Sequence, residues 1–381
     1  MTLGIENTRV LNIINGDYFS GAERVQDLLA LRLPDFGYDV GFVCLKQGKF
    51  PDYRKSKTPL YEIPMKSKFD LKPAWEIARI VKRDGYALLH THSPRAAMLG
   101  RVAAWLSGVP MVHHIHSPAA RDSENAWRNR ISSIMERLSL IGVAQLIAVS
   151  QSLNSYLRIQ GWSSQLISTV PNGVPTPGAL QNRLAPGSEW VIGCVALFRP
   201  RKGIEVLIEV LAKLRQEGRN VRLRAIGPFE TAEYESVIHA LAKKLAVDEF
   251  IDWIGFTSDV NAEFSKMSVF VLPSLFGEGM PMVILEAMAS GIPVVASDVE
   301  GISEVLTHGS TGLVVPPGKV DSLCEALTDL MEAKYDWNTM RKDAYQLQTK
   351  RFSDRSMAEG VAAVFQEIFQ SRLLNNKLPI Q

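Results

Sequence analysis

Short apolar runs alternate with amphipathic segments along the whole chain, and this alternation constrains the fold more than any other feature. The amphipathic segments span about 10–15 residues and have the period of a helix. Strands that alternate with helices form parallel sheets through right-handed crossovers. The predicted strands form two series, 9–14, 39–45, 87–92, 111–116 and 146–150, then 190–198, 221–227, 250–256, 269–274, 293–298 and 312–317. We therefore expect two doubly wound α/β domains.

The segment 169–189, TVPNGVPTPGALQNRLAPGSE, separates the two series and has neither a strand nor a helix period. Its Asn-Gly pair favours a turn, and its prolines stiffen the chain as in a hinge between domains. A chain of 381 residues is also longer than one core usually supports. A domain boundary is therefore predicted here.

The composition indicates the cellular compartment of the protein. The three cysteines, Cys44, Cys194 and Cys324, form no paired motif, which favours a reducing environment. The first ten residues lack the basic and apolar regions of a signal peptide, and no apolar run is long enough to span a membrane. We therefore expect a cytoplasmic protein.

The charge is distributed unevenly along the chain. Residues 1–170 contain 21 Lys and Arg against 14 Asp and Glu, whereas the remainder contains 21 against 26. A basic half indicates an anionic partner. Basic and aromatic residues mix in 46–72 and 126–141, which is typical of a surface that docks on the inner face of an anionic membrane. A solvated face over an ordinary core explains both stretches equally well.

Ligands of open parallel sheets bind beyond the carboxyl ends of the strands. Three cations, Arg199, Arg201 and Lys202, follow the predicted strand 190–198 and precede a helix predicted to begin near Gly203. Cations oppose the dipole of a helix N-terminus, so a purely structural role explains them poorly. Together with the first amides of the helix they are typical of a diphosphate site.

A weaker signal follows the first predicted strand. Gly16 and Gly21 bracket a loop that leads into a helix beginning near Ala22. Glycine at a helix entrance allows an anion to approach the backbone amides. The spacing does not match a dinucleotide-binding motif, and a tight turn explains the loop equally well.

Two glutamates, Glu278 and Glu286, lie eight positions apart, with seven residues between them, across a predicted loop-to-helix junction. The helix is expected to begin near Pro281, because proline suits the first turn. A carboxylate can accept two hydrogen bonds from the vicinal hydroxyls of a ribose, which suits Glu286, and Glu278 would then lie beside the attached sugar. Two ordinary glutamates are the alternative. Backbone amides expected to face the ligand belong to Gly279, Met280 and Met282.

The segment from Glu278 to Glu286 resembles the E-x7-E signature of retaining glycosyltransferases of family 4, which have the GT-B architecture. The motifs SGAERV, HTHS, VHHIHS, VPNGV, FRPRKGIEVLIEV and GFTSDV also occur in the order seen in that family, so the resemblance covers nearly the whole chain. It implies two Rossmann-like domains that face each other across a cleft. Residues 1–175 would bind the acceptor, with 352–381 crossing back to them, and residues 185–351 would bind the nucleotide sugar.

The resemblance also implies roles for particular residues. Arg199 and Lys202 would hold the diphosphate, Glu278 the donor sugar, and His116 the sugar hydroxyls, which makes these four the predicted catalytic residues. Pro281 stands where many members have glycine, so one backbone donor to the sugar is absent and the identity of the sugar stays open. The predicted substrate-binding residues are Gly21, Gly279, Met280, Met282, Val283, Glu286, Gly227 and Phe256.

The implied activity is transfer of a sugar from a UDP- or GDP-type donor to a glycan or lipid-linked acceptor, in polysaccharide or glycolipid biosynthesis. Retention of the anomeric configuration follows from the resemblance. No cofactor or metal is expected, because fixed cations can stabilise the leaving diphosphate and the sequence contains no D-x-D. Nucleic acid is not an expected partner, and the oligomeric state stays open. The alternatives are a catalytically silent nucleotide-sugar-binding subunit and a GT-B-type epimerase.

Five histidines, at positions 90, 92, 113, 114 and 116, lie on two neighbouring predicted strands. On a strand, His90 and His92 share one face, as do His114 and His116. Imidazole is a common metal ligand, but no carboxylate lies close by on these strands. Hydrogen-bonded core histidines are therefore the preferred interpretation, and no metal is predicted.

Overall fold

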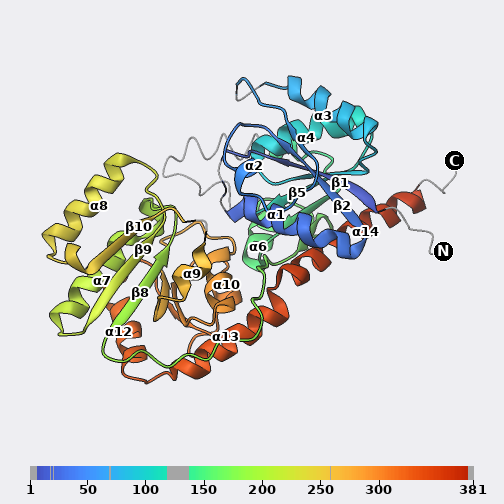
Figure 1. Cartoon of the computed structure of the whole chain (residues 1–381). Helices are drawn as coiled ribbons and strands as arrows, with labels where there is room; N and C mark the ends of the chain where they lie inside the picture. The colour runs from blue at the N-terminus through green and yellow to red at the C-terminus, as the bar shows by residue number, and fades with distance from the viewer. Residues whose placement is uncertain are drawn as a thin grey trace. The chain divides into compact units, whose positions relative to one another are not determined.

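The computed structural model describes residues 7–17, 19, 21–67, 70–117, 137–257 and 259–375. It divides the chain into two compact units, one formed by Met1–Gly173 with Asp354–Gln381 and the other by Val174–Ser353. Each unit contains one parallel sheet with helices packed against it (Figure 1). The predicted α/β fold with two doubly wound sheets is confirmed.

The sheet of the first unit has seven strands in the order β3-β2-β1-β4-β5-β6-β7. All neighbouring strands pair in parallel. The strands are β1 (Thr8–Ile14), β2 (Tyr38–Cys44), β3 (Leu60–Glu62), β4 (Leu88–Thr91), β5 (Met111–Ile115), β6 (Gln145–Ala148) and β7 (Ile167–Thr169). The helices are α1 (Gly21–Arg32), η1 (Leu33–Phe36), α2 (Phe50–Tyr53), α3 (Lys72–Arg83), α4 (Pro94–Ser107), α6 (Gln151–Ile159), η3 (Ser164–Leu166) and α14 (Asp354–Asn375).

Helix α14 comes last in the chain but packs on the first unit. Its Phe365 ring meets Tyr38 of β2 edge-on at 5.3 Å, and its Asp354 accepts a 2.7 Å hydrogen bond from Arg32 of α1. Helices α1 and α14 therefore share one layer, while α3 and α4 pack together in another.

The sheet of the second unit has six strands in the order β10-β9-β8-β11-β12-β13. The strands are β8 (Trp190–Val195), β9 (Val221–Ile226), β10 (Ile251–Gly255), β11 (Val269–Leu272), β12 (Val294–Ser297) and β13 (Leu313–Val315). The helices are η4 (Pro200–Lys202), α7 (Ile204–Gln216), α8 (Ala232–Lys244), η5 (Asp248–Phe250), α9 (Val260–Phe264), α10 (Met282–Ala289), α11 (Ile302–Val305), α12 (Val320–Met331) and α13 (Trp337–Arg351).

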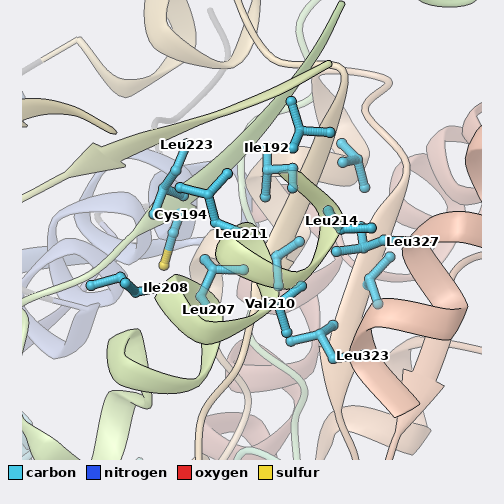
Figure 2. Packing of buried hydrophobic residues seen from close by; sticks show 14 of the residues in the cluster. Ile192, Cys194, Leu207, Ile208, Val210, Leu211, Leu214, Leu223, Leu323 and Leu327 are labelled. Atoms are coloured by element: carbon cyan, nitrogen blue, oxygen red, sulfur yellow. The ribbon is translucent and has the colours of Figure 1, made fainter. Parts of the chain in front are cut away.

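Helix α7 carries the largest share of the core in this unit. Leu207 and Leu211 are fully buried and pack with Ile192 of β8 and with Leu323 and Leu327 of α12 (Figure 2). This packing holds the N-terminus of α7 at the carboxyl end of β8.

The strand order reverses between β8 and β11 in the second unit and between β1 and β4 in the first. Such a switch point separates the two loops that follow the adjacent strands and leaves a crevice where ligands bind. In the second unit these loops contain Arg199–Gly203 and Pro273–Pro281. The predicted diphosphate and sugar residues therefore flank this switch point.

Candidate functional site in the second unit

The loop after β8 is a tight turn built on Gly203. Residues Pro200–Lys202 form the 3₁₀ turn η4, and Gly203 ends it with a left-handed φ of 65°. A Cβ atom at Gly203 would lie 2.2 Å from the carbonyl oxygen of Pro273, so only glycine fits. The backbone N–H of Leu275 also donates to the carbonyl of Arg201 at 2.8 Å. The cationic turn is therefore fixed against the loop after β11.

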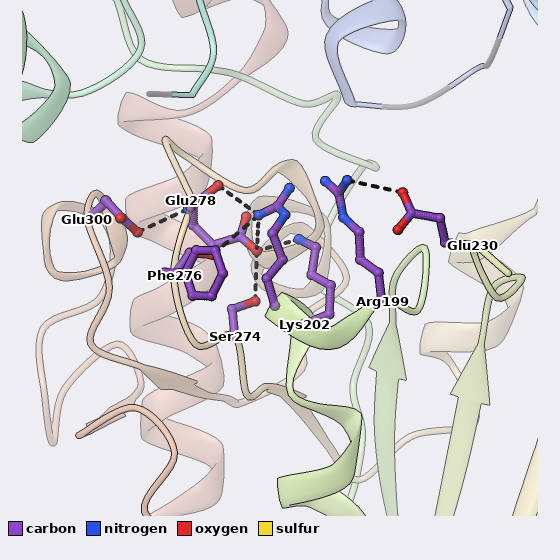
Figure 3. Close-up of polar contacts among 9 residues, drawn as sticks. Arg199, Lys202, Glu230, Ser274, Phe276, Glu278 and Glu300 are labelled. Carbon is purple, nitrogen blue, oxygen red and sulfur yellow. Dashed lines mark hydrogen bonds and ion pairs between the residues drawn. The ribbon is translucent and has the colours of Figure 1, made fainter. Parts of the chain in front are cut away.

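An ion network joins the two loops. The Lys202 ammonium pairs with Oε1 of Glu278, and Oγ of Ser274 donates to the same oxygen at 2.7 Å (Figure 3). Nη1 of Arg201 lies 3.9 Å from this oxygen. The Lys202 and Glu278 side chains are 15% and 7% exposed, so water screens the pair weakly.

Burial and neighbouring charge compete in setting the pKa values of this pair. Burial alone raises the pKa of Glu278, but the charges of Lys202 and Arg201 outweigh it and the pKa lies below its usual value. Burial lowers the pKa of Lys202, an effect that Glu278 opposes and Arg201 reinforces. The carboxylate is thus held charged and paired with a cation.

Three residues that the sequence did not link to Glu278 position the Glu278 loop. Nη1 of Arg201 donates to the carbonyls of Gly277 at 2.8 Å and Phe276 at 3.3 Å. Oε2 of Glu300 accepts from the N–H of Glu278 at 3.0 Å, and Glu300 has a φ of 36°, which is strained for a non-glycine residue. Ser274 is the third. The sequence showed Arg201 only as part of a cation cluster and gave no signal for Glu300 or Ser274.

Arg199 lies on the same turn but has a different partner. Its Nη1 lies 3.4 Å from Oε1 of Glu230, on the side away from Glu278 (Figure 3). Its Nε is buried and has no hydrogen-bond partner among the described residues. Arg199 and Lys202 therefore supply two cations, each paired with an acidic side chain. An anionic ligand could replace these side chains as the partners.

Helix α10 follows the Glu278 loop. Pro281 is the N-cap, with extended backbone, and the helix begins at Met282, so the prediction that the helix begins near Pro281 is confirmed. Within the described residues, Pro281 makes no side-chain capping hydrogen bond to this helix, which leaves the amides of Met282 and Val283 to a ligand. Glu286 is buried at 7% exposure. Of the other predicted ligand contacts, Gly279 and Met280 are buried and Val283 is half-buried.

The neighbouring strand ends supply Gly227 and Phe256. Gly227 has a φ of 126°, and a Cβ there would lie 1.8 Å from the carbonyl oxygen of Ala196, so the ends of β8 and β9 approach too closely for any other residue. Its N–H donates to the carbonyl of Gly255 at 2.8 Å. Phe256 follows β10 with 46% of its surface exposed. Every predicted residue of this unit therefore lies at or near the carboxyl end of its sheet.

Two predicted site residues belong to the first unit. Gly21 begins α1, is exposed, and has no atom within 4 Å of an added Cβ, so packing does not require glycine there. His116 follows β5 and is half-buried, with Nε2 3.0 Å from Nδ1 of His92. Burial lowers the pKa of His116 to about 3, so the ring is neutral at pH 7.

The interpretation of His90 and His114 as hydrogen-bonded core residues is wrong. Both rings are fully buried, and none of their four nitrogens has a hydrogen-bond partner within the described part of the chain. The cause is the register of β4 and β5, which places the rings side by side under the apolar helix α14, where Phe365 meets His90 edge-on at 5.4 Å.

The structure corrects one part of the predicted membrane-docking surface. Phe50 is fully buried and packs edge-on against Phe42 at 5.0 Å, so it belongs to the core rather than to a surface. Phe69 and most of the segment 126–141 lie outside the described residues. Among the helices that the structure describes, none is long and apolar enough to cross a membrane.

Comparison with known proteins identifies the class. Two family models match, Glycosyltransferase Family 4 over residues 19–176 and Glycosyl transferases group 1 over residues 179–347. The chain is 25% identical over 340 residues to UDP-Gal:alpha-D-GlcNAc-diphosphoundecaprenol alpha-1,3-galactosyltransferase of Escherichia coli, covering 83% of this chain and 86% of that protein. It is 27% identical over 317 residues to phosphatidyl-myo-inositol mannosyltransferase of Mycolicibacterium smegmatis, covering 80% and 79%. The crystal structure of Anabaena Alr3699/HepE in complex with UDP-glucose superposes with a TM-score of 0.83 at 20% identity, covering 95% and 100%.

Two parallel doubly wound sheets of this kind define the GT-B class of glycosyltransferases. The chain belongs to the GT4-type glycosyltransferases, and the two family models together span most of it. It is a hexosyltransferase, as are the galactosyltransferase and the mannosyltransferase to which it is similar. These matches favour the enzyme over the silent subunit and the epimerase.

Proposed function

We propose that the enzyme transfers a hexose from a UDP- or GDP-sugar to a lipid-linked or glycan acceptor, with retention of configuration and without a metal ion at the diphosphate. The observation that carries the proposal is the turn Arg199–Gly203, which places three cations at the switch point of the second sheet. The activities for which the Escherichia coli and mycobacterial relatives are named support a lipid-linked acceptor, and that of the Escherichia coli relative supports a UDP-linked donor.

The cations act on the leaving group. Cleavage of the bond between the sugar and the diphosphate develops negative charge on the diphosphate and positive charge on the anomeric carbon. Arg199, Lys202 and the uncapped amides of α7 and α10 offer fixed positive charge to the former. A site prearranged in this way does not need Mg²⁺ to neutralise the phosphates.

Glu278 has two successive partners in this proposal. Without a donor, its carboxylate is the counter-ion that keeps the Lys202 ammonium paired. When the diphosphate takes that place on Lys202, Glu278 is released to accept hydrogen bonds from hydroxyls of the donor sugar. The exchange avoids an unpaired buried charge at every stage.

The remaining donor contacts follow the sheet edge. Glu286 accepts from the ribose hydroxyls, and Phe256 lies beside the base. Gly227 permits the close approach of the strand ends on which the nucleotide rests. The other donor contacts are made by Gly279, Met280, Met282 and Val283.

The first unit contributes His116 and Gly21. His116 contacts the donor sugar, and Gly21 allows the substrate to approach the backbone at the start of α1. We assign no protein nucleophile. Retention then results from attack of the acceptor on the same face that the diphosphate leaves, with the departing phosphate accepting the acceptor proton.

Release of nucleoside diphosphate tests the reaction. With a UDP- or GDP-sugar and a polyprenyl-diphosphate-linked glycan, we expect release only when the acceptor is present, at an unchanged rate in EDTA. The anomeric proton coupling of the product, measured by NMR, should match that of the donor. EDTA-sensitive release that added Mg²⁺ or Mn²⁺ restores would contradict the cationic site, and an inverted product would contradict same-face attack.

His116 can be tested separately from folding. His116→Ala is expected to lower kcat by about 10²-fold, because a hydrogen bond to the reacting sugar is lost. The melting temperature of the protein should change little, because His116 is only half-buried. The matched control is His308→Ala, an exposed histidine of the second unit. Near-normal turnover of His116→Ala would remove His116 from the site.

A further inference from the structure

A row of histidines lies on one face of the first sheet. β4 and β5 are parallel and pair His90 with Val112 and Thr91 with His113. Paired residues of adjacent strands face the same side, and alternate residues of one strand share a face. His90, His92 and His114 therefore point to the same layer, the one that α14 covers through Phe365.

Most ring nitrogens of these histidines have no hydrogen-bond partner in this layer, as far as the structure describes it. His90 and His114 are fully buried and His92 is 7% exposed. Five of their six ring nitrogens have no hydrogen-bond partner in the described part of the chain, both of His90, both of His114 and Nε2 of His92. Polar atoms in a protein interior are nearly always satisfied by protein, water or a ligand, so a cluster of five orphans marks this layer as a candidate ligand site.

The three imidazole rings converge. One ligand atom from each of His90, His92 and His114 lies within 4.8 Å of the others. Zinc–imidazole bonds are about 2.0–2.1 Å long, which puts two ligands of a tetrahedral ion about 3.3 Å apart. Small rotations of the rings about their side-chain bonds, which move each nitrogen by less than about 1 Å, would bring the nitrogens to this separation.

The tautomer of His92 also suits a cation. Nδ1 of His92 lies 3.0 Å from Nε2 of half-buried His116. When that Nδ1–H donates to His116, Nε2 of His92 keeps the lone pair that a metal binds.

We propose that His90, His92 and His114 bind one transition-metal ion of the zinc class, with His116 as the outer hydrogen-bond partner that orients His92. Three imidazoles without a carboxylate or a thiolate favour Zn²⁺, Co²⁺, Ni²⁺ or Cu²⁺ over Mg²⁺ and Mn²⁺. Asn12, which pairs with His90 across β1 and β4 and whose amide is also an orphan, can hydrogen-bond a water at the fourth position.

The ion has a structural role, because its ligands lie within the sheet of the first unit and none of them belongs to the proposed diphosphate site. It goes beyond the transfer reaction, and only its outer partner His116 is shared with the proposed donor site. The expected survival of transfer in EDTA concerns Mg²⁺ and Mn²⁺ at the diphosphate, whereas the ion proposed here is buried beneath α14.

Metal content and Co²⁺ spectroscopy of the intact, untagged protein test the proposal. We expect about one Zn²⁺ ion per chain by mass spectrometry after purification without chelator. After removal of Zn²⁺, titration with Co²⁺ should reach an end point at about one equivalent with the visible absorption of a four-coordinate site, and Zn²⁺ should abolish that absorption. These measurements need no variant.

His114→Gln removes one ligand and should weaken Co²⁺ binding by at least about 10-fold. The matched control is His113→Gln, the next residue of the same strand, whose ring faces the other side and contacts Thr91. It should keep the Co²⁺ spectrum. A wild-type protein without bound metal and without a Co²⁺ spectrum would overturn the proposal, and so would equal Co²⁺ binding by the His114→Gln variant.

Discussion

Replacing Lys202 with methionine lowers kcat/KM for sugar transfer by about 10²–10³-fold, the loss expected when one prearranged charge that stabilises a leaving group is removed. Methionine keeps the length and apolar stem of lysine but has no charge. The substitution also leaves the buried Glu278 carboxylate without its main partner, because Arg201 is 3.9 Å away. We therefore expect the melting temperature to fall as well, by about 5–10 °C.

The double variant Lys202→Met/Glu278→Gln separates these two effects. Glutamine retains the hydrogen bond from Ser274 without a charge, so the double variant should regain most of the lost melting temperature while transfer stays low. Lys213→Met is the control, because Lys213 lies on α7 in an ion pair with Asp321, whose side chain is 90% exposed. It should change neither quantity appreciably. Recovery of transfer in the double variant would show that Lys202 serves the structure rather than the reaction.

The fold was predictable because each level of the sequence indicates the same architecture. Strand-forming runs such as 221–227 alternate with helical segments, and the turn residues fall between them, so the parallel sheets follow from pattern alone. The two strands that escaped prediction, β3 and β7, have three residues each and lie at the sheet edges. β13 is equally short but was predicted, because its sequence LVV is wholly apolar, whereas LYE of β3 and IST of β7 contain polar residues that interrupt the apolar run.

The residue types of the candidate site were predictable, but their partners were not. A cluster of cations before a helix is visible in the sequence as Arg199, Arg201 and Lys202. Their distribution among Glu230, the Gly277 carbonyl and Glu278 depends on how the loop after β11 returns past β8, which no local pattern encodes. Glu300 shows this most clearly, since it contacts Glu278 from 22 positions further along the chain.

The prediction for His90 and His114 was wrong for a related reason. Alternation placed His90 and His92 on one face, yet whether a buried imidazole finds a partner depends on the opposite layer. That layer is α14, more than two hundred residues away in the sequence, and it presents Phe365 instead of a polar group. The interpretation as satisfied core residues assumed a neighbour that the fold does not supply.

Replacing Glu286 with glutamine raises KM for the nucleotide sugar by about 10–100-fold and changes kcat less, because a hydrogen bond from a ribose hydroxyl to a charged acceptor is worth about 1.5–3 kcal/mol. The ribose lies away from the bond that breaks, so its contacts stabilise the ground state and the transition state alike. Glu209→Gln, an exposed glutamate of α7, is the control and should leave KM unchanged.

Donors that lack one ribose hydroxyl show whether Glu286 acts through the ribose. The wild-type enzyme should bind 2′-deoxy and 3′-deoxy forms of the nucleotide sugar more weakly than the parent donor. Glu286→Gln should lose most of this discrimination, because the variant no longer offers the charged acceptor that the missing hydroxyl needs. If the variant discriminates as strongly as the wild type, the carboxylate does not contact the ribose. Glu286 would then be a buried acid held by the protein itself, and the ribose site would lie elsewhere along the carboxyl edge of this sheet.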